Sequence, residues 1–348
     1  MKTLLEVKNL RKSFDHKSIA AIENLSFELL QNEIVSIIGP SGTGKSTLVK
    51  MIAGEIAADE GSILFDKNIS IDNFKNNFSY VPQELSLDNS KTIFENIGTH
   101  LIEENEEKRH HAIRDMIEVF GLQYKDHKYP SELSTGQKSR VEMAKALVTN
   151  PRLLILDEPF ANLDRSLRNE IKSELVEILK ERKISALIVT HNLEDAFSHS
   201  DKIMVLNDGG IKQFSPAREV YTRPADAWVA HFTGPVNLMA GTVGEAKTDE
   251  FQQTNKLDTF TVPCYDKKIN SGDFAYMLIR PEACVVSKEG KYKGKVKKII
   301  HLGPTSEVWL QIGGIERFKV SASLSDTVVI NRSVKFDINI DQCQLLSI

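Results

Sequence analysis

Residues 39–47 read Gly-Pro-Ser-Gly-Thr-Gly-Lys-Ser-Thr, and this stretch decides the fold of the chain. It contains the pattern Gly-x-x-x-x-Gly-Lys-Ser/Thr, which sets two glycines, a lysine and a hydroxyl at fixed spacing. The apolar run 33–38 before it predicts a buried parallel strand. The apolar spacing of 47–53 after it predicts a helix that ends near Gly54. A strand, a glycine-rich turn and a helix in this order predict a phosphate-binding loop in an α/β fold.

The residue types of this loop suit the phosphates of a nucleotide. Glycines let backbone N–H groups curl around phosphate oxygens without Cβ clashes, and the helix N-terminus adds partial positive charge. Lys45 is predicted to reach the phosphate oxygens, and the Ser46 hydroxyl is predicted to bind Mg²⁺. The other loop residues predicted to contact the nucleotide are Gly39, Ser41, Gly42, Gly44 and Thr47.

Two adjacent carboxylates follow a second apolar run. Residues 153–156 predict a buried strand, and Asp157 and Glu158 stand at its carboxyl end, where open α/β sheets bind ligands. Asp157 is predicted to hold Mg²⁺ through water, because Mg²⁺ takes oxygen ligands and keeps several of its waters. Glu158 is predicted to polarise the attacking water as a general base. Together with the phosphate-binding loop, this pair predicts the hydrolysis of ATP.

A third apolar run, residues 184–190, predicts another buried strand, and His191 follows it. An imidazole at this point is placed to donate a hydrogen bond to the γ-phosphate. A histidine at a strand end is equally common as a surface or capping residue. From the residues alone, both interpretations of His191 stay open.

These motifs, taken with Leu-Ser-Thr-Gly-Gln at residues 133–137, resemble those of the ATP-binding cassette ATPases. The family signature is Leu-Ser-Gly-Gly-Gln, so Thr135 stands where the family has glycine. In that family the signature turn binds the γ-phosphate of the ATP held by the other subunit. The resemblance assigns this contact to Ser134, Gly136 and Gln137. It also implies that two copies of the chain enclose two ATP molecules.

The same resemblance implies roles for four further positions. It makes His191 the switch histidine that holds the γ-phosphate. It makes Gln83 a residue that touches Mg²⁺ and the attacking water and senses the membrane partner. Phe14 matches the aromatic residue that stacks on adenine, and an aromatic face suits a purine ring. Residues 161–164 resemble the loop that crosses the dimer interface and ends at Asp164.

The resemblance to the cassette ATPases covers residues 1 to about 235. It implies an α/β P-loop NTPase with a RecA-like core, an N-terminal antiparallel β region and a helical subdomain at about 85–150. Residues 103–118 support this insertion, because they are charged, helix-forming and free of glycine and proline.

The pattern changes after residue 234, where helical periodicity gives way to short β-like runs separated by turns. Several short strands predict a small barrel. Leu-Ile-Arg-Pro-Glu at 278–282 resembles the TOBE domain of importer ATPases for spermidine, ferric iron, sulfate, molybdate and maltose-type solutes. We therefore predict an ATP-binding cassette domain over 1–234 and a small all-β, OB-like barrel over 235–348.

Composition excludes some other classes of function. The formal net charge of −4 gives no general basic signal for nucleic acid. The lysine-rich stretch 291–298 is predicted to be a solvated edge strand, because lysines commonly protect such edges. The three cysteines share no ligand spacing and suit structural thiols. No run approaches 18 apolar residues, so any transported solute is predicted to cross through separate membrane subunits.

The resemblance implies the ATPase subunit of an importer, peripheral to the cytoplasmic face of the inner membrane. Its implied partners are a second copy of the chain, integral-membrane permease subunits and, indirectly, an external solute-binding protein, with no nucleic acid. The sequence does not name the cargo. Two alternative hypotheses stay open: a soluble cassette ATPase that acts on nucleic acid or ribosomes, and a regulatory ATPase whose barrel senses a ligand.

Overall fold

The computed structural model describes residues 2–14, 21–66, 69–70, 77–84, 86–103, 105–161, 163–247, 250–254, 257–266, 268–323 and 328–348. The chain divides into two compact units between Ala217 and Arg218. Residues 217–232, which form two short helices on either side of Pro224, therefore group almost entirely with the second unit. The predicted domain boundary at 234 and 235 lies just after these helices.

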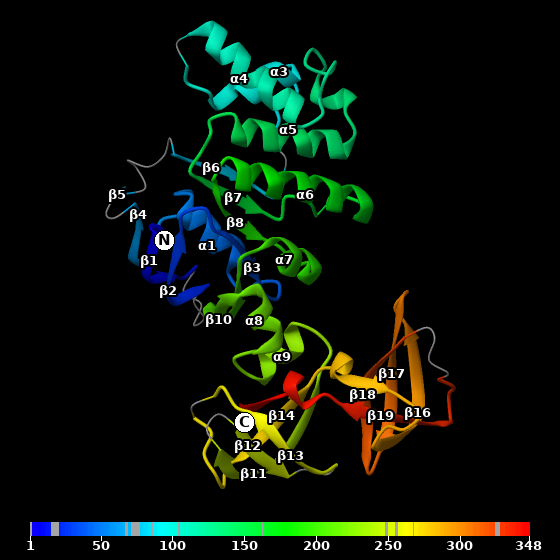
Figure 1. Cartoon of the computed structure of the whole chain (residues 1–348). Coiled ribbons are helices and arrows are strands. Elements are labelled where there is room, and N and C mark those ends of the chain that lie inside the picture. The colour runs from blue at the N-terminus through cyan, green and yellow to red at the C-terminus, as the bar shows by residue number, and fades with distance from the viewer. Residues whose placement is uncertain are drawn as a thin grey trace. The chain divides into compact units, whose positions relative to one another are not determined.

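A mainly parallel sheet forms the centre of the first unit, with strand order β10-β9-β3-β8-β7-β6 (Figure 1). Its strands are β3 (Ile34–Ile38), β6 (Phe78–Val81), β7 (Leu153–Asp157), β8 (Ser185–Val189), β9 (Lys202–Asn207) and β10 (Gly210–Pro216). Every residue of β3, β7 and β8 is buried. Burial on both faces is why these strands read as continuous apolar runs in the sequence.

An antiparallel sheet with order β2-β1-β4-β5 forms the predicted N-terminal β region. Its strands are β1 (Thr3–Lys12), β2 (Ile22–Leu30), β4 (Glu60–Phe65) and β5 (Ile69–Ser70). One apolar cluster joins this sheet to the core through Leu48 and Val49 of the helix α1 (Lys45–Ile52), with Val35 and Ile37 of β3 on its other side. This packing fixes the helix that follows the glycine-rich loop.

The other helices of the first unit include those of the predicted helical subdomain. They are α3 (Ile93–Ile97), α4 (Glu106–Val119), α5 (Thr135–Leu147), α6 (Arg165–Glu181) and α7 (Leu193–His199), with 3₁₀ turns at Gly98–His100 and Pro130–Glu132. Helices α3, α4 and α5 lie between β6 and β7 in the chain and gather at one end of the unit (Figure 1). Helix α4 begins three residues later than the predicted charged stretch, because the Asn105 side chain caps it by accepting from Lys108 N at 3.1 Å.

The second unit contains the predicted closed barrel and a separate sheet that was not predicted. The barrel has the order β15-β18-β17-β16-β19 and the sheet the order β13-β12-β11-β14-β20. The helices are α8 (Ala217–Thr222) and α9 (Ala227–Phe232), and 3₁₀ turns lie at Pro281–Ala283 and Ile340–Gln342. The barrel strands are β15 (Cys284–Val286), β16 (Tyr292–His301), β17 (Thr305–Ile312), β18 (Ile315–Ser323) and β19 (Ser333–Ile338). The sheet strands are β11 (Asn237–Lys247), β12 (Glu250–Thr254), β13 (Thr259–Pro263), β14 (Phe274–Ile279) and β20 (Gln344–Ser347).

One expectation about the barrel is wrong. The lysine-rich stretch 291–298 was predicted to be an edge strand, yet β16 pairs with β17 on one side and β19 on the other. A closed barrel leaves no free edge. The three cysteines are free and buried, as predicted for structural thiols. Within the described ranges, no helix is long and apolar enough to cross a membrane.

Candidate active site

The candidate site lies where the parallel strands of the core sheet end. Strands β6, β7, β8 and β3 pair in parallel, so their carboxyl ends meet at one edge of the sheet. The loop after β3 carries the Gly-rich sequence, and β7 ends at Asp157. His191 follows β8, and Gln83 follows β6. The sheet topology therefore collects loops that are as far apart in the sequence as Gly39 and His191.

The glycine-rich loop is closed tightly against its surroundings. A Cβ on Gly39 would lie 2.2 Å from the Leu206 carbonyl oxygen, and one on Gly44 would lie 2.2 Å from the Ala21 carbonyl oxygen. Gly44 also has φ 93°, which a residue with a side chain rarely adopts. Because the backbone of Leu206 and Ala21 leaves no room for a Cβ, only glycine fits at these two positions of the loop.

Lys45 is a buried ammonium within this loop. Its Nζ donates to the carbonyl oxygens of Gly39 at 2.9 Å and Pro40 at 2.7 Å. Burial lowers the pKa of Lys45, and the negative charges of Glu158 and Asp157 oppose that shift. The lysine therefore lies beside the narrow loop, with acidic groups near enough to favour its charge. This donor set fits the oxygens of a nucleotide phosphate.

Ser46 and Asp157 form an oxygen pair next to the loop. The Ser46 hydroxyl donates to Asp157 Oδ1 at 3.1 Å, and Asp157 is only 2% exposed. Burial raises the pKa of Asp157, while the bond from Ser46 acts in the opposite direction. A hydroxyl and a carboxylate are the oxygen donors that Mg²⁺ prefers, so these two residues fit the metal. The third predicted metal residue, Gln83, is exposed and makes no hydrogen bond to either of them in the described part of the chain.

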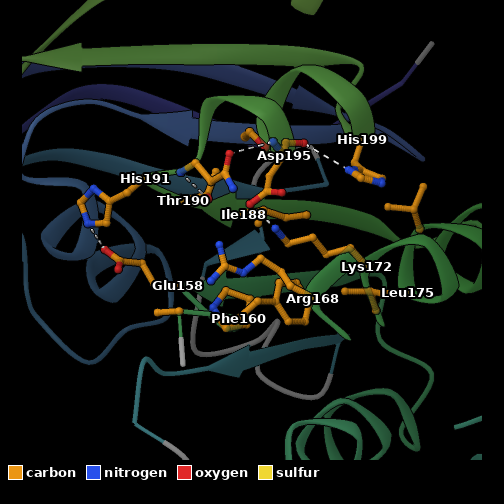
Figure 2. Close-up of a pocket in the computed structure, with 15 residues that line it drawn as sticks. Glu158, Phe160, Arg168, Lys172, Leu175, Ile188, Thr190, His191, Asp195 and His199 are labelled. Carbon is orange, nitrogen blue, oxygen red and sulfur yellow. Dashed lines mark hydrogen bonds and ion pairs between the residues drawn. The ribbon is translucent and has the colours of Figure 1, made fainter. Parts of the chain in front are cut away.

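Glu158 and His191 are in direct contact. Figure 2 shows their side chains pointing toward each other, and His191 Nε2 lies 2.5 Å from Glu158 Oε1. The backbone of Glu158 has φ 51°, which is unusual for a residue with a side chain and is a form of strain found at functional sites. Its N–H donates to the Val189 carbonyl oxygen at 3.1 Å, which ties the residue to the end of β8. The carboxylate is thus held beside the imidazole.

The signature residues lie elsewhere, at the N-terminus of α5. Ser134 caps the helix, and its side chain and that of Gln137 bond reciprocally to each other's backbone N–H. Gly136 packs so closely that a Cβ would lie 2.3 Å from Leu167 Cδ2, whereas Thr135 is exposed. Among the described residues, no hydrogen bond or ion pair joins this turn to Lys45 or the rest of the glycine-rich loop.

Two further predicted contact residues are also outside this cluster. Phe14 follows β1 with 44% of its surface exposed, and Lys12 Nζ lies 5.6 Å from its ring centroid. The Asp164 side chain caps α6 by accepting from Leu167 N at 3.0 Å. The predicted interface loop 161–164 also includes Asn162, which is outside the described residues.

Sequence reasoning missed a group of charged residues behind Glu158 and His191. Arg168, Lys172 and Asp195 line a mostly apolar cavity of about 230 Å³ that reaches Glu158 and His191 (Figure 2). Lys172 forms an ion pair with Asp195, although both side chains are only 8% exposed. One feature of the sequence could have indicated this group: Lys172 lies among the apolar residues of the buried face of α6, beside Ile171 and Leu175.

Comparison with known proteins gives two matching families. Residues 22–161 match the ABC transporter family, and residues 277–346 match the TOBE domain family. The spermidine/putrescine import ATP-binding protein PotA of Clostridium acetobutylicum is 34% identical over 315 residues, covering 89% of this chain and 87% of that protein. The protein of the same name from Aliivibrio fischeri is 32% identical over 327 residues, covering 91% and 87%.

Solved structures of ATP-binding cassette proteins resemble part of this chain, and two of them illustrate the likeness. The dimeric post-hydrolysis state of the ATP-binding cassette MJ0796 with ADP and Pi has a TM-score of 0.55 and 26% identity, covering 62% of this chain and 99% of that one. The cbiO1 protein of Clostridium perfringens, part of the ABC transporter complex cbiONQ, has a TM-score of 0.58 and 28% identity, covering 63% and 91%.

Proposed function

This chain belongs to the ABC transporter family of ATPases, and on that premise we propose that it powers solute import through separate membrane subunits. The observation that carries the proposal is the cluster at the sheet edge. Lys45, the Ser46–Asp157 pair and the Glu158–His191 contact all lie at the ends of parallel strands. These groups bind phosphate, hold a divalent cation and activate water, which are the needs of ATP hydrolysis.

Each residue has a distinct part in the proposed reaction. Lys45 and the loop N–H groups bind the phosphate oxygens, and Ser46 and Asp157 hold Mg²⁺, which supplies neutralising charge when bound. Glu158 Oε accepts the proton of the attacking water. His191 contacts Glu158, so its proposed part is to keep that carboxylate oriented and, once ATP is bound, to donate a hydrogen bond to the γ-phosphate. Catalysis then rests mainly on positioning and charge stabilisation.

A second copy of the chain is proposed to complete the site. Ser134, Gly136 and Gln137 make no hydrogen bond to the glycine-rich loop within the described part of one chain. Their turn nevertheless presents the N-terminus of α5, whose backbone N–H groups favour an anion. Two chains related by twofold symmetry would each supply this turn to the other's ATP. The relative solved as a dimer with ADP and Pi supports this arrangement.

A cleft of about 740 Å³ is our candidate surface for a permease subunit. It is lined by Tyr80 of β6, by Ser86, and by Ile102, which is 86% exposed. On one wall, the buried Lys145 donates to the Ser86 carbonyl at 3.0 Å and hydroxyl at 2.9 Å. Ser86 and Gln83 both belong to the segment that follows β6. A helix docked in the cleft would therefore contact the segment that carries Gln83. Such docking would place the chain at the inner face of the membrane.

Polyamines are the first cargo to test. Several relatives at 32–34% identity are named for spermidine and putrescine import. Cargo choice is proposed to lie in the permease and in an external binding protein. The cargo is therefore identified through the partners of the chain.

The first test is the turnover of Glu158→Gln. The amide keeps the shape of the side chain but removes the base, so ATP hydrolysis is expected to fall by roughly 10²–10⁴-fold while ATP binding persists. Turnover is measured by phosphate release and binding by a fluorescent ATP analogue. Glu177→Gln, an exposed change on α6, is the matched control and keeps normal turnover. Normal turnover in Glu158→Gln rejects Glu158 as the base.

The second test identifies the partners. A tagged Glu158→Gln chain is incubated with ATP and gently solubilised native membranes, and co-purifying proteins are identified. A polytopic membrane protein supports import, and a companion binding protein names the cargo. Recovery of nucleic acid or ribosomal components alone would replace the transport proposal with the soluble cassette hypothesis.

A further inference from the structure

Two helices extend directly from the segments that carry Glu158 and His191. Helix α6 begins at Arg165, seven residues after Glu158, and α7 begins at Leu193, two residues after His191. Any shift of one helix against the other is passed to the short segments before them. Helix α6 also packs against α7.

A buried ion pair joins these helices on the inner side. The Lys172 ammonium of α6 contacts the Asp195 carboxylate of α7, and each side chain is only 8% exposed (Figure 2). Lys172 Nζ also lies 5.4 Å from the ring centroid of Phe160, two residues after Glu158. One ammonium group thus contacts both the turn that follows Glu158 and the helix that follows His191.

Asp195 is linked back to the histidine segment through the start of α7. The Asn192 side chain caps the helix by accepting from Asp195 N at 3.4 Å. The Asn192 N–H in turn donates to Thr190 Oγ1 at 3.0 Å. His191 lies between these two residues, so the position of Asp195 is coupled to the backbone on both sides of the imidazole.

The energetics of the pair suit a geometric role better than a stabilising one. Burial lowers the pKa of Lys172, and the contact with Asp195 opposes this shift. Buried ion pairs seldom stabilise a fold more than well-packed apolar residues of similar volume. They do fix one arrangement of the elements that they join, because a shift leaves a buried charge without its partner. An ion pair at this point is therefore a constraint on helix position.

The same two helices carry an exposed ion pair that serves as an internal comparison. Arg165 Nη2 lies 2.9 Å from Glu194 Oε2, with the side chains 79% and 60% exposed. Exposed pairs of this kind contribute little, since water screens them. Glu194 and Asp195 are neighbours in the sequence, so the two pairs differ chiefly in burial.

We propose that Lys172 and Asp195 are positioning residues for ATP hydrolysis, which hold α6 against α7 so that the Glu158 carboxylate stays aligned with His191. This inference rests on the proposed role of Glu158 as the base. It predicts that loss of the pair lowers kcat and leaves ATP binding intact, because neither residue belongs to the glycine-rich loop.

The test uses the double variant Lys172→Met/Asp195→Leu, which replaces both charges by apolar groups of similar volume. Its unfolding midpoint is expected to stay near that of the unchanged protein. Its kcat is expected to fall roughly 10- to 100-fold, as for a small misplacement of reacting groups, with KM for ATP within about twofold. Lys172→Arg keeps the pair and is expected to retain most of the turnover.

The control is Arg165→Met/Glu194→Leu, which removes the exposed pair and is expected to leave kcat unchanged. A folded Lys172→Met/Asp195→Leu protein with normal kcat overturns the inference, and so does an equal loss of kcat in the control. If the buried double variant does not fold, the isosteric variant Asp195→Asn is measured instead. The proposal expects a reduced kcat with an unchanged KM for ATP in this variant. A normal kcat would contradict the proposal. Glu158→Gln in the same assay separates the two proposals, because its normal turnover would reject the function itself.

Discussion

At the residue scale, two adjacent carboxylates occupy different environments. Asp157 is buried at the end of β7 and accepts a hydrogen bond from Ser46, whereas Glu158 faces the imidazole of His191. Different surroundings allow neighbouring acids to take different parts in one reaction. Burial raises the pKa of Asp157, so in the proposed metal-binding role a proton would compete with Mg²⁺ for this carboxylate at higher pH than for an exposed aspartate.

This competition predicts a pH-dependent demand for Mg²⁺. In the proposed reaction Asp157 must be ionised to hold Mg²⁺, so the Mg²⁺ concentration for half-maximal turnover is expected to rise as pH falls. Asp157→Asn cannot titrate and is expected to need roughly 10- to 100-fold more Mg²⁺ at pH 8. The protonation of ATP also changes with pH, but it affects both proteins equally. Comparing the Mg²⁺ titrations of the two proteins at each pH therefore removes its contribution. If the Mg²⁺ requirement changed equally with pH in both proteins, the ionisation of Asp157 would not determine Mg²⁺ binding.

At the element scale, one carboxylate connects the antiparallel sheet to the core sheet. Asp66 follows β4 and pairs with Lys2 before β1 at 2.5 Å and with Arg152 before β7 at 2.8 Å. These bonds lower the pKa of Asp66 to about 2. A lowered pKa in the folded state stabilises the protein above the ordinary aspartate pKa, and this stabilisation is lost as pH falls toward 2.

We therefore expect Asp66→Asn to destabilise the first unit only when the carboxylate is ionised. At pH 7 the loss is about 1 kcal/mol, because solvent screens part of the ~2 kcal/mol that such a pKa difference implies. The difference from the unchanged protein should shrink as pH falls below 4. Urea unfolding followed by circular dichroism measures it, with Glu177→Gln as the control. A constant difference across this pH range would exclude the ion pairs as its cause.

At the scale of the whole molecule, each unit has its own core, and a buried arginine organises the second. Arg280 is 3% exposed, and its Cζ lies 4.1 Å from the ring centroid of Tyr221. Its guanidinium donates to oxygens of the segment 221–235. The acceptors are the carbonyls of Tyr221, Ala230, Gly234 and Pro235 and the hydroxyl of Thr233, at 2.9–3.2 Å. These bonds explain why the segment with α8 and α9 groups with the second unit.

Arg280→Met should therefore destabilise the second unit by about 3 kcal/mol while ATP binding by the first unit is unchanged, because buried carbonyls lose their donors. Both tryptophans, Trp228 and Trp309, lie in the second unit, so tryptophan fluorescence during urea unfolding reports on that unit. Arg332→Met, an exposed change on the barrel, is the control. An unchanged midpoint in Arg280→Met would show that the segment is held by apolar packing.

Local patterns in the sequence determined the family and the core fold, and they predicted most residues of the candidate site. Strand–turn–helix order around residues 39–47 predicted the phosphate-binding loop, and apolar runs predicted β7 and β8. These features are visible because one short segment carries both the residue types and their spacing. The barrel was predicted too, although the short strands β12, β15 and β20 were not, since short strands have weak periodicity. The longer strand β11 was also not predicted.

Only the tertiary structure decided how distant segments meet. It placed His191 against Glu158, a contact that neither residue's place in the sequence specifies. It brought Lys172 and Asp195 together in a buried pair, and it enclosed β16 in a barrel where an edge strand was predicted. Pairing of strands and burial of charges depend on contacts between residues far apart in the chain, and no local pattern records those contacts.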